Sequence, residues 1–110
     1  MQHAKRKSQL QERRVAKDIG GHVQPGSGAP EFYKGDVRQD QQLRVECKTT
    51  SSQAYHVRLM DLEKIKSEAL RGGDPYWAMQ VEFQTQTGGK QFAIIDWASF
   101  LYLMKNMQEG

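Results

Sequence analysis

The chain has 110 residues, of which 37% are hydrophobic and 26% charged, a composition typical of one soluble globular domain and not of a disordered segment. No apolar run approaches the ~18 residues of a membrane span, and the basic N-terminus lacks the apolar stretch of a signal peptide. The single cysteine, Cys47, excludes an internal disulfide and favours a reducing, cytoplasmic setting.

The first 20 residues carry most of the positive charge. Six basic residues against two acidic ones give this segment a net charge of +4, so the other ninety residues sum to −1. A basic end on a near-neutral body favours a polyanionic partner, most commonly nucleic acid, with a solvated helix face as the alternative. The candidate DNA-contacting residues are Lys5, Arg6, Lys7, Arg13, Arg14 and Lys17.

The first half of the chain is predicted to form a helix followed by strands. Apolar spacing indicates a helix over residues 5–19, ended by Gly20-Gly21. Residues 22–35 are expected to form a loop, with a short strand at 22–24 as the alternative. Strands are expected from residue 36 and over 43–48, around a turn at 39–42, and a third strand over 54–59.

The second half is predicted to run helix, hairpin, helix. The second helix covers residues 60–70 and stops at Gly72-Gly73, and strands at 76–84 and 91–95 flank a turn at 87–90. Asp96 is the expected N-cap of a final apolar helix over 97–107, whose apolar stripe is expected to face the sheet. This order predicts a single domain spanning residues 1–110, an α/β fold in which helices cover one mixed sheet.

The residues with chemical potential are Asp36, Glu46 and Lys48. Residues two apart on a strand share a face, so Glu46 and Lys48 project together, and a hairpin would bring Asp36 beside Glu46. Two adjacent carboxylates repel each other unless a cation neutralises them, and Mg²⁺ with two carboxylates and phosphate oxygens is a common arrangement. A lysine beside such an ion can orient water or stabilise charge on a phosphorane.

Simpler interpretations exist for each residue. Glu-x-Lys on a strand is most often an exposed ion pair, and Gly-Asp is most often a turn. Cys47 alternates into the apolar face and is expected in the core, as are Trp77 and Trp97, with an interface as the alternative for Trp97. His56 lacks metal-ligand spacing and is expected to be structural or a DNA contact.

Several segments together resemble the PD-(D/E)XK nuclease superfamily. They are Glu12 on a basic first helix, Gly26-Ser27-Gly28, Lys34-Gly35-Asp36-Val37 and residues 45–50, Val-Glu-Cys-Lys-Thr-Thr. The resemblance covers roughly residues 8–70 and is greatest to the Holliday junction resolvases of archaea and their viruses. Gly35 stands where the superfamily's name has a proline, a frequent departure.

The resemblance implies a restriction-endonuclease-like fold with an αβββαβ-type core and a role for each matching residue. Asp36 and Glu46 would bind Mg²⁺, with Mn²⁺ as a substitute, and Lys48 would assist the attacking water. Glu12 would support the metal site, and Ser27 would contribute to cleavage. The implied setting is the cytoplasm of a bacterial, archaeal or phage-infected cell.

The prediction is therefore a Mg²⁺-dependent DNA endonuclease that cleaves four-way (Holliday) junctions as a homodimer. Resolution needs two symmetric cuts, each chain supplies one site, and the final helix has more apolar surface than one buried face requires. The alternatives are another small endonuclease (nicking, repair or sequence-specific), a noncatalytic DNA-binding module of the same fold, and an acidic-site protein unrelated to DNA.

Overall fold

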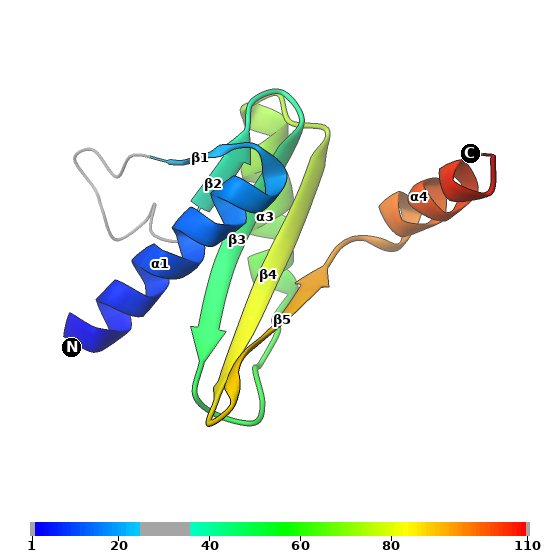
Figure 1. The fold of residues 1–110 in the computed structure, drawn as a ribbon. Helices are drawn as coiled ribbons and strands as arrows, with labels where there is room; N and C mark the ends of the chain where they lie inside the picture. Colours follow the sequence, from blue (N-terminus) through cyan, green and yellow to red (C-terminus); the bar gives the residue numbers. More distant parts are fainter. Residues whose placement is uncertain (1, 25–35, 110) are drawn as a thin grey trace.

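The molecule is built on one five-stranded mixed sheet with the order β1-β2-β3-β4-β5 (Figure 1). The computed structural model describes residues 2–24 and 36–109, with side chains described for 9–24 and 37–108. Strands β3 and β4 are parallel, and the other neighbours are antiparallel. The strands are β1 (His22–Val23), β2 (Asp36–Gln39), β3 (Leu43–Thr50), β4 (Tyr76–Thr85) and β5 (Gly88–Ile94).

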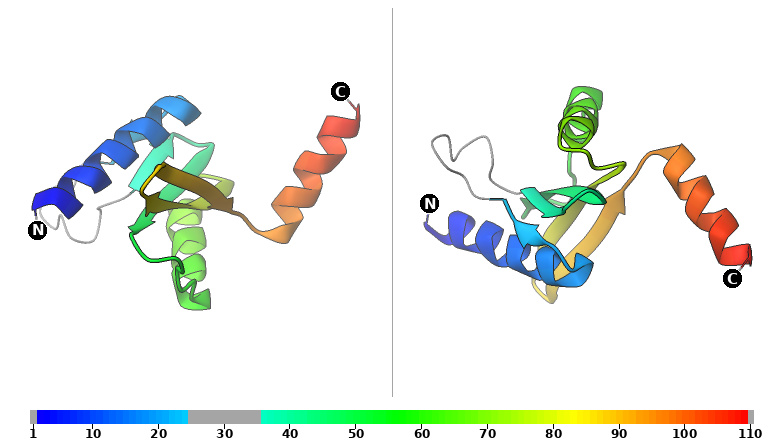
Figure 2. Two further views of the ribbon diagram at one scale, coloured as in Figure 1. Left: turned by 60° about the horizontal axis from the view of Figure 1, so that its bottom comes forward. Right: turned by 90° about the horizontal axis from the view of Figure 1, so that it is seen from above.

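Two helices cover opposite faces of this sheet (Figure 2). Helix α1 (Gln2–Ile19) contributes Val15 and Ala16 to a core with four sheet residues: Val37, Val45, Cys47 and Ala78. Helix α3 (Leu59–Arg71) contributes Ile65 to a second core with Met79 and Val81. The predicted α/β fold, a mixed sheet flanked by helices, is confirmed at this level. Within the described residues, no helix combines the length and apolar character that crossing a bilayer requires.

The period of two along β3 separates its residues between these faces. Val45 and Cys47 are buried in the α1-side core, as predicted for Cys47. Arg44, on the other face, forms an ion pair with Glu68 of α3, with 3.3 Å between Nη2 and Oε2. Glu46 and Lys48 are two and four residues from Arg44, so they share the α3 side of the strand.

The turn after α1 depends on the two glycines that were predicted to end it. Gly20 has φ +67°, the left-handed conformation common after a helix C-terminus. A Cβ on Gly21 would lie 2.2 Å from the carbonyl oxygen of Arg38, so the close approach of α1 to β2 requires a glycine there. The short strand at 22–24, given as an alternative to a loop, is present as β1.

The predicted strand at 54–59 is wrong. Residues 54–58 form neither helix nor strand, and α3 begins at Leu59. Both sides of β3 are already occupied, by β2 and β4, so this segment has no adjacent strand with which to pair there. It serves instead as the connection from β3 to α3 that a parallel β3–β4 pair requires.

The last helix, α4 (Trp97–Glu109), projects away from the sheet (Figure 1). The predicted N-cap is confirmed, because the Ser99 amide donates to Asp96 Oδ1 at 2.7 Å. The expectation that its apolar stripe faces the sheet is wrong: Trp97 is 70% exposed and Met107 75%. Trp77 packs partly buried beside the α3-side core, but Trp97 lies outside either core.

Candidate functional site

Strands β2 and β3 bring together the two acidic positions singled out from the sequence. In the antiparallel register, Asp36 is the direct partner of Glu46. Residues in direct register on an antiparallel pair have Cβ atoms about 4.5–5.5 Å apart. The side chain of Asp36 lies outside the described residues, so the backbone register is the observation that links this pair.

Glu46 and Lys48 form an ion pair on the α3 side of the sheet. Lys48 Nζ lies 3.1 Å from Glu46 Oε1, and the two side chains are 35% and 13% exposed. Burial alone would lower the pKa of Lys48, but the charge and hydrogen bond of Glu46 outweigh it and raise that pKa. Lys48 is therefore a cation at neutral pH, placed against a mostly buried carboxylate that retains access to solvent.

The connection to α3 and the first turn of that helix add three residues that the sequence had not singled out. Arg58 donates two hydrogen bonds, each of 3.0 Å, to the carboxylate of Asp61, and this contact lowers the pKa of Asp61. Burial raises the pKa of Tyr55, and the nearby charge of Lys48 opposes that rise. Lys48 also interacts electrostatically with Asp61. Their position in the sequence is the one feature that could have identified them, because they lie in the segment that follows the Glu-x-Lys strand.

The remaining predicted catalytic residues are placed differently. Glu12 is buried on α1, the helix that packs on the opposite face from Glu46 and Lys48. Ser27 lies outside the described residues, as do Gly26, Gly28 and Gly35. No group of three His, Cys, Asp or Glu side chains suited to a metal occurs among the described side chains, which do not include that of Asp36.

Helix α1 presents basic residues beside a groove of about 530 Å³, lined by Leu10, Arg13, Arg14, Lys17, Glu82 and Gln84. Arg14 Nη2 donates to Glu82 Oε2 at 2.9 Å, which raises the pKa of Arg14. Arg13 and Lys17 are exposed on the same helix. Arg14 therefore has a structural contact that the sequence did not predict. The side chains of Lys5, Arg6 and Lys7 lie outside the described residues.

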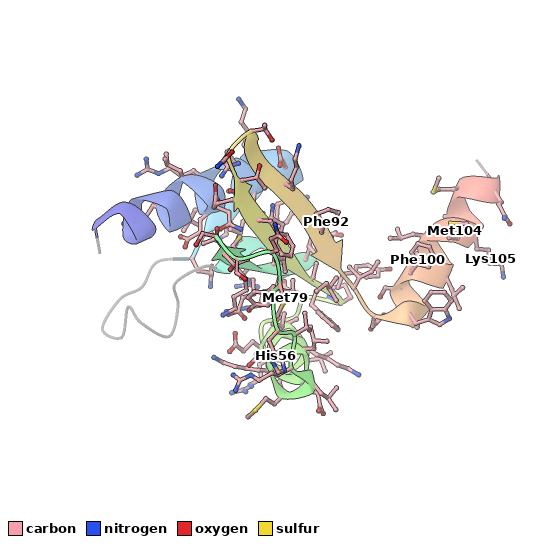
Figure 3. The ribbon with its side chains drawn as sticks, turned by 90° about the horizontal axis from the view of Figure 1, so that it is seen from below. His56, Met79, Phe92, Phe100, Met104 and Lys105 are labelled. Carbon is pink, nitrogen blue, oxygen red and sulfur yellow. The ribbon has the colours of Figure 1, made fainter. Side chains whose placement is uncertain are left out.

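His56 lies exposed in the connection before α3 (Figure 3).

Comparison with known proteins returned no match: no family model, curated protein or solved structure is significantly similar to this chain.

Proposed function

We propose that this protein is a Mg²⁺-dependent DNA endonuclease with a restriction-endonuclease-like fold, and that it cleaves four-way junctions. The observation that carries the proposal is the register of β2 and β3, which pairs Asp36 with Glu46. Lys48 follows on the same face, 3.1 Å from Glu46. This is the arrangement that the resemblance to PD-(D/E)XK nucleases implies for those three positions.

The donor chemistry fits a hard divalent cation. Asp36 and Glu46 place two carboxylates at paired positions of adjacent strands, and Mg²⁺ is commonly held by one or two carboxylates with water and phosphate oxygens as its other ligands. Glu46 retains 13% side-chain exposure, so a ligand can reach it from solvent. When bound, the ion would polarise the phosphate and lower the pKa of a coordinated water.

The chain's own residues have separate tasks in this proposal. Asp36 and Glu46 hold the cation. Lys48 places a positive charge where negative charge develops on the phosphate, and it can orient the attacking water. Arg13 and Lys17 on α1 supply phosphate contacts that position DNA without reading its sequence.

The experiment is cleavage of labelled four-way junction, fork, flap, single-stranded and linear duplex DNA in Mg²⁺, Mn²⁺ or EDTA. We expect junction cleavage in Mg²⁺ and none in EDTA. Lys48→Ala should reduce the cleavage rate by about 10²–10³-fold, as the loss of one transition-state donor does. Asp36→Asn and Glu46→Gln should abolish cleavage but retain junction binding.

Lys64→Ala is the matched control. Lys64 also forms an ion pair with a glutamate, Glu68, at 3.8 Å, but from α3 and with 54% exposure. The Lys64→Ala variant should cleave DNA at the wild-type rate, and circular dichroism should show that all variants are folded. Undiminished cleavage in EDTA, or wild-type turnover of Lys48→Ala, would refute the site. Junction binding without cleavage by the wild-type protein would favour the noncatalytic DNA-binding module.

A further inference from the structure

Helix α4 is rich in large apolar side chains and yet exposed. Residues 97–109 contain two charged residues, Lys105 and Glu109. A wide apolar surface on a helix normally packs against another element. Exposed fractions on α4 range from 40% to 75% for Trp97, Phe100, Leu101, Tyr102, Leu103, Met104 and Met107. Figure 3 shows Phe100 and Met104 on this helix, well away from Met79 and Phe92 of the sheet.

The direction of α4 is fixed where it leaves the sheet. Only Ile95 and Asp96 separate it from β5; Ile95 packs against the α1-side core and Asp96 caps the helix. Tyr102 and Tyr76 form a tilted ring contact at 6.4 Å. The radius of gyration, 14.3 Å, exceeds the roughly 13 Å expected of a compact chain of this length, consistent with a projecting arm.

The same chain carries an apolar groove that α4 does not fill. Helix α1 packs over β1, β2 and β3, and the α1 side of β4 and β5 lies beside it. A groove of about 320 Å³ opens there, lined in part by Val15, Ile19, Leu43, Val45, Ala78 and Ala93. Its volume is at the lower end of the ~300–1,000 Å³ of ligand pockets, so it fits side chains of a helix and not the helix itself.

We propose that α4 docks in this groove on a second copy of the chain, and that the two copies exchange helices reciprocally around a two-fold axis. Reciprocal exchange covers the groove and one face of α4 in both chains at once. Closure onto the chain's own groove would require a turn at Ile95 and Asp96, which would break the core packing of Ile95 or the cap. A seam between two α4 helices would leave the groove of each chain uncovered.

The apolar area of one face of α4 approaches what a stable dimer needs. Trp97, Phe100, Leu101, Met104 and Met107 share that face and are about half exposed, so at about 150–250 Å² for a fully buried aromatic side chain they offer roughly 500 Å² per helix. Two helices give roughly 1,000 Å² before the grooves are counted, against about 1,200–2,000 Å² in stable interfaces. Charge is also compatible, because α4 carries Lys105 and the groove is bordered by Asp18.

Light scattering on the full chain is the first test. We expect about twice the 12.6 kDa chain mass at micromolar concentration. Leu101→Glu should weaken the dimer at least about 100-fold, because the substitution enters the interface twice and each tenfold change corresponds to about 1.4 kcal/mol. Leu70→Glu, at an equally apolar site on α3 with 64% exposure, is the control and should leave the dimer intact. A monomeric wild-type chain, or an intact Leu101→Glu dimer, contradicts the proposal.

Cross-linking distinguishes exchange from the other arrangements. The double variant Met104→Cys/Ala93→Cys is treated with a short flexible bismaleimide and run on a denaturing gel, with the wild-type chain as the control for buried Cys47. Exchange predicts a cross-linked dimer in the double variant and not in either single variant.

An internal cross-link in a monomer would show that α4 closes on its own chain. A dimer from Met104→Cys alone would show an α4–α4 seam. Both outcomes overturn the proposal, and neither depends on DNA or metal, so the nuclease proposal is tested separately.

Discussion

Helices α3 and α4 each contain 13 residues, and they reverse the usual relation between composition and burial. α3 carries seven charged or polar side chains, but it buries Ile65 and Ala69 against the sheet. α4 is the more apolar of the two, but its large side chains are at least 40% exposed. Apolar spacing therefore identifies a helix whose surface needs burial. It does not identify whether the same chain or a second chain buries that surface.

The largest expected effect follows from removing one apolar side chain from each helix. Ile65→Ala should lower the free energy of unfolding by about 2–5 kcal/mol, because Ile65 is 1% exposed and its loss leaves a cavity. Leu101→Ala should change it by less than about 0.5 kcal/mol at protein concentrations where the chain is monomeric. Urea unfolding measures both.

Protein concentration sharpens this comparison further. If α4 is covered by a second copy, the effect of Leu101→Ala on stability grows with concentration, because association stabilises the folded state by mass action. The effect of Ile65→Ala on a monomeric chain has no such dependence. A large, concentration-independent loss for Leu101→Ala would mean that α4 packs within its own chain.

Helix α1 differs from both, because polar contacts attach it to the sheet. Gln11, 1% exposed, donates to the Lys48 carbonyl oxygen at 3.0 Å and to Gln80 Oε1 at 2.6 Å. Arg14 reaches Glu82, whose side chain is only 2% exposed. A mostly polar helix can therefore be fixed on a sheet by a few buried hydrogen bonds together with the two core residues Val15 and Ala16.

The second expected effect comes from breaking the Arg14–Glu82 ion pair. Arg14→Ala should lower the free energy of unfolding by about 1–3 kcal/mol, because it removes a donor from a buried carboxylate. The double variant Arg14→Ala/Glu82→Gln should recover most of that loss, since the amide carries no charge to compensate. Thermal unfolding of the single and double variants measures this recovery. A double variant no more stable than Arg14→Ala would contradict a structural role for the pair.

Arg13 and Lys17 provide the matched comparison on the same helix. Arg13→Ala/Lys17→Ala should leave stability within about 0.5 kcal/mol, as exposed sites do. The affinity of this double variant for junction DNA should depend less on salt. The slope of the logarithm of affinity against the logarithm of salt concentration should fall by roughly 0.9 for each phosphate that the variant no longer neutralises. Filter binding between low and moderate salt measures the slope. An unchanged slope would place the DNA-binding surface elsewhere.

The sequence predicted local features well and long-range contacts poorly. Periodicity located α1, α3, α4 and β3, and Gly20-Gly21 marked the turn, because these depend on residues close in the chain. The strand expected at 54–59 failed because a strand needs a partner, and β3 already had two. The Arg14–Glu82 ion pair joins residues 68 positions apart, which no local pattern encodes.

The residues of the candidate site also differ in how well local sequence predicted their placement. Glu46 and Lys48 are two residues apart on one strand, so their proximity followed from strand geometry alone. The pairing of Asp36 with Glu46 required only a hairpin, and the observed register contains it. Tyr55 and Asp61 approach Lys48 through the path of the β3–α3 connection, which was predicted as a strand, so their placement could not be foreseen.

The smallest expected effect concerns the point where α4 begins. Asp96→Ala removes the acceptor of the Ser99 amide and should destabilise the first turn of α4 by about 1 kcal/mol, the typical cost of losing an N-cap. Hydrogen exchange at the Ser99 amide measures this directly, with roughly fivefold faster exchange expected. In Asp96→Ala, exchange at the Ser99 amide equal to that of the wild type would mean that the Asp96 cap does not stabilise the first turn of α4.

The pH dependence of the same amide provides an independent check. Hydrogen bonds from Ser99 lower the pKa of Asp96 below its ordinary 3.8. The folded pKa is therefore below the unfolded one, so the carboxylate's contribution is complete above 3.8 and is lost as pH falls through the folded pKa. Asp96→Asn keeps an acceptor but has no carboxylate to titrate. Protection of Ser99, corrected for intrinsic exchange, should thus fall in acid for the wild type and stay level for Asp96→Asn.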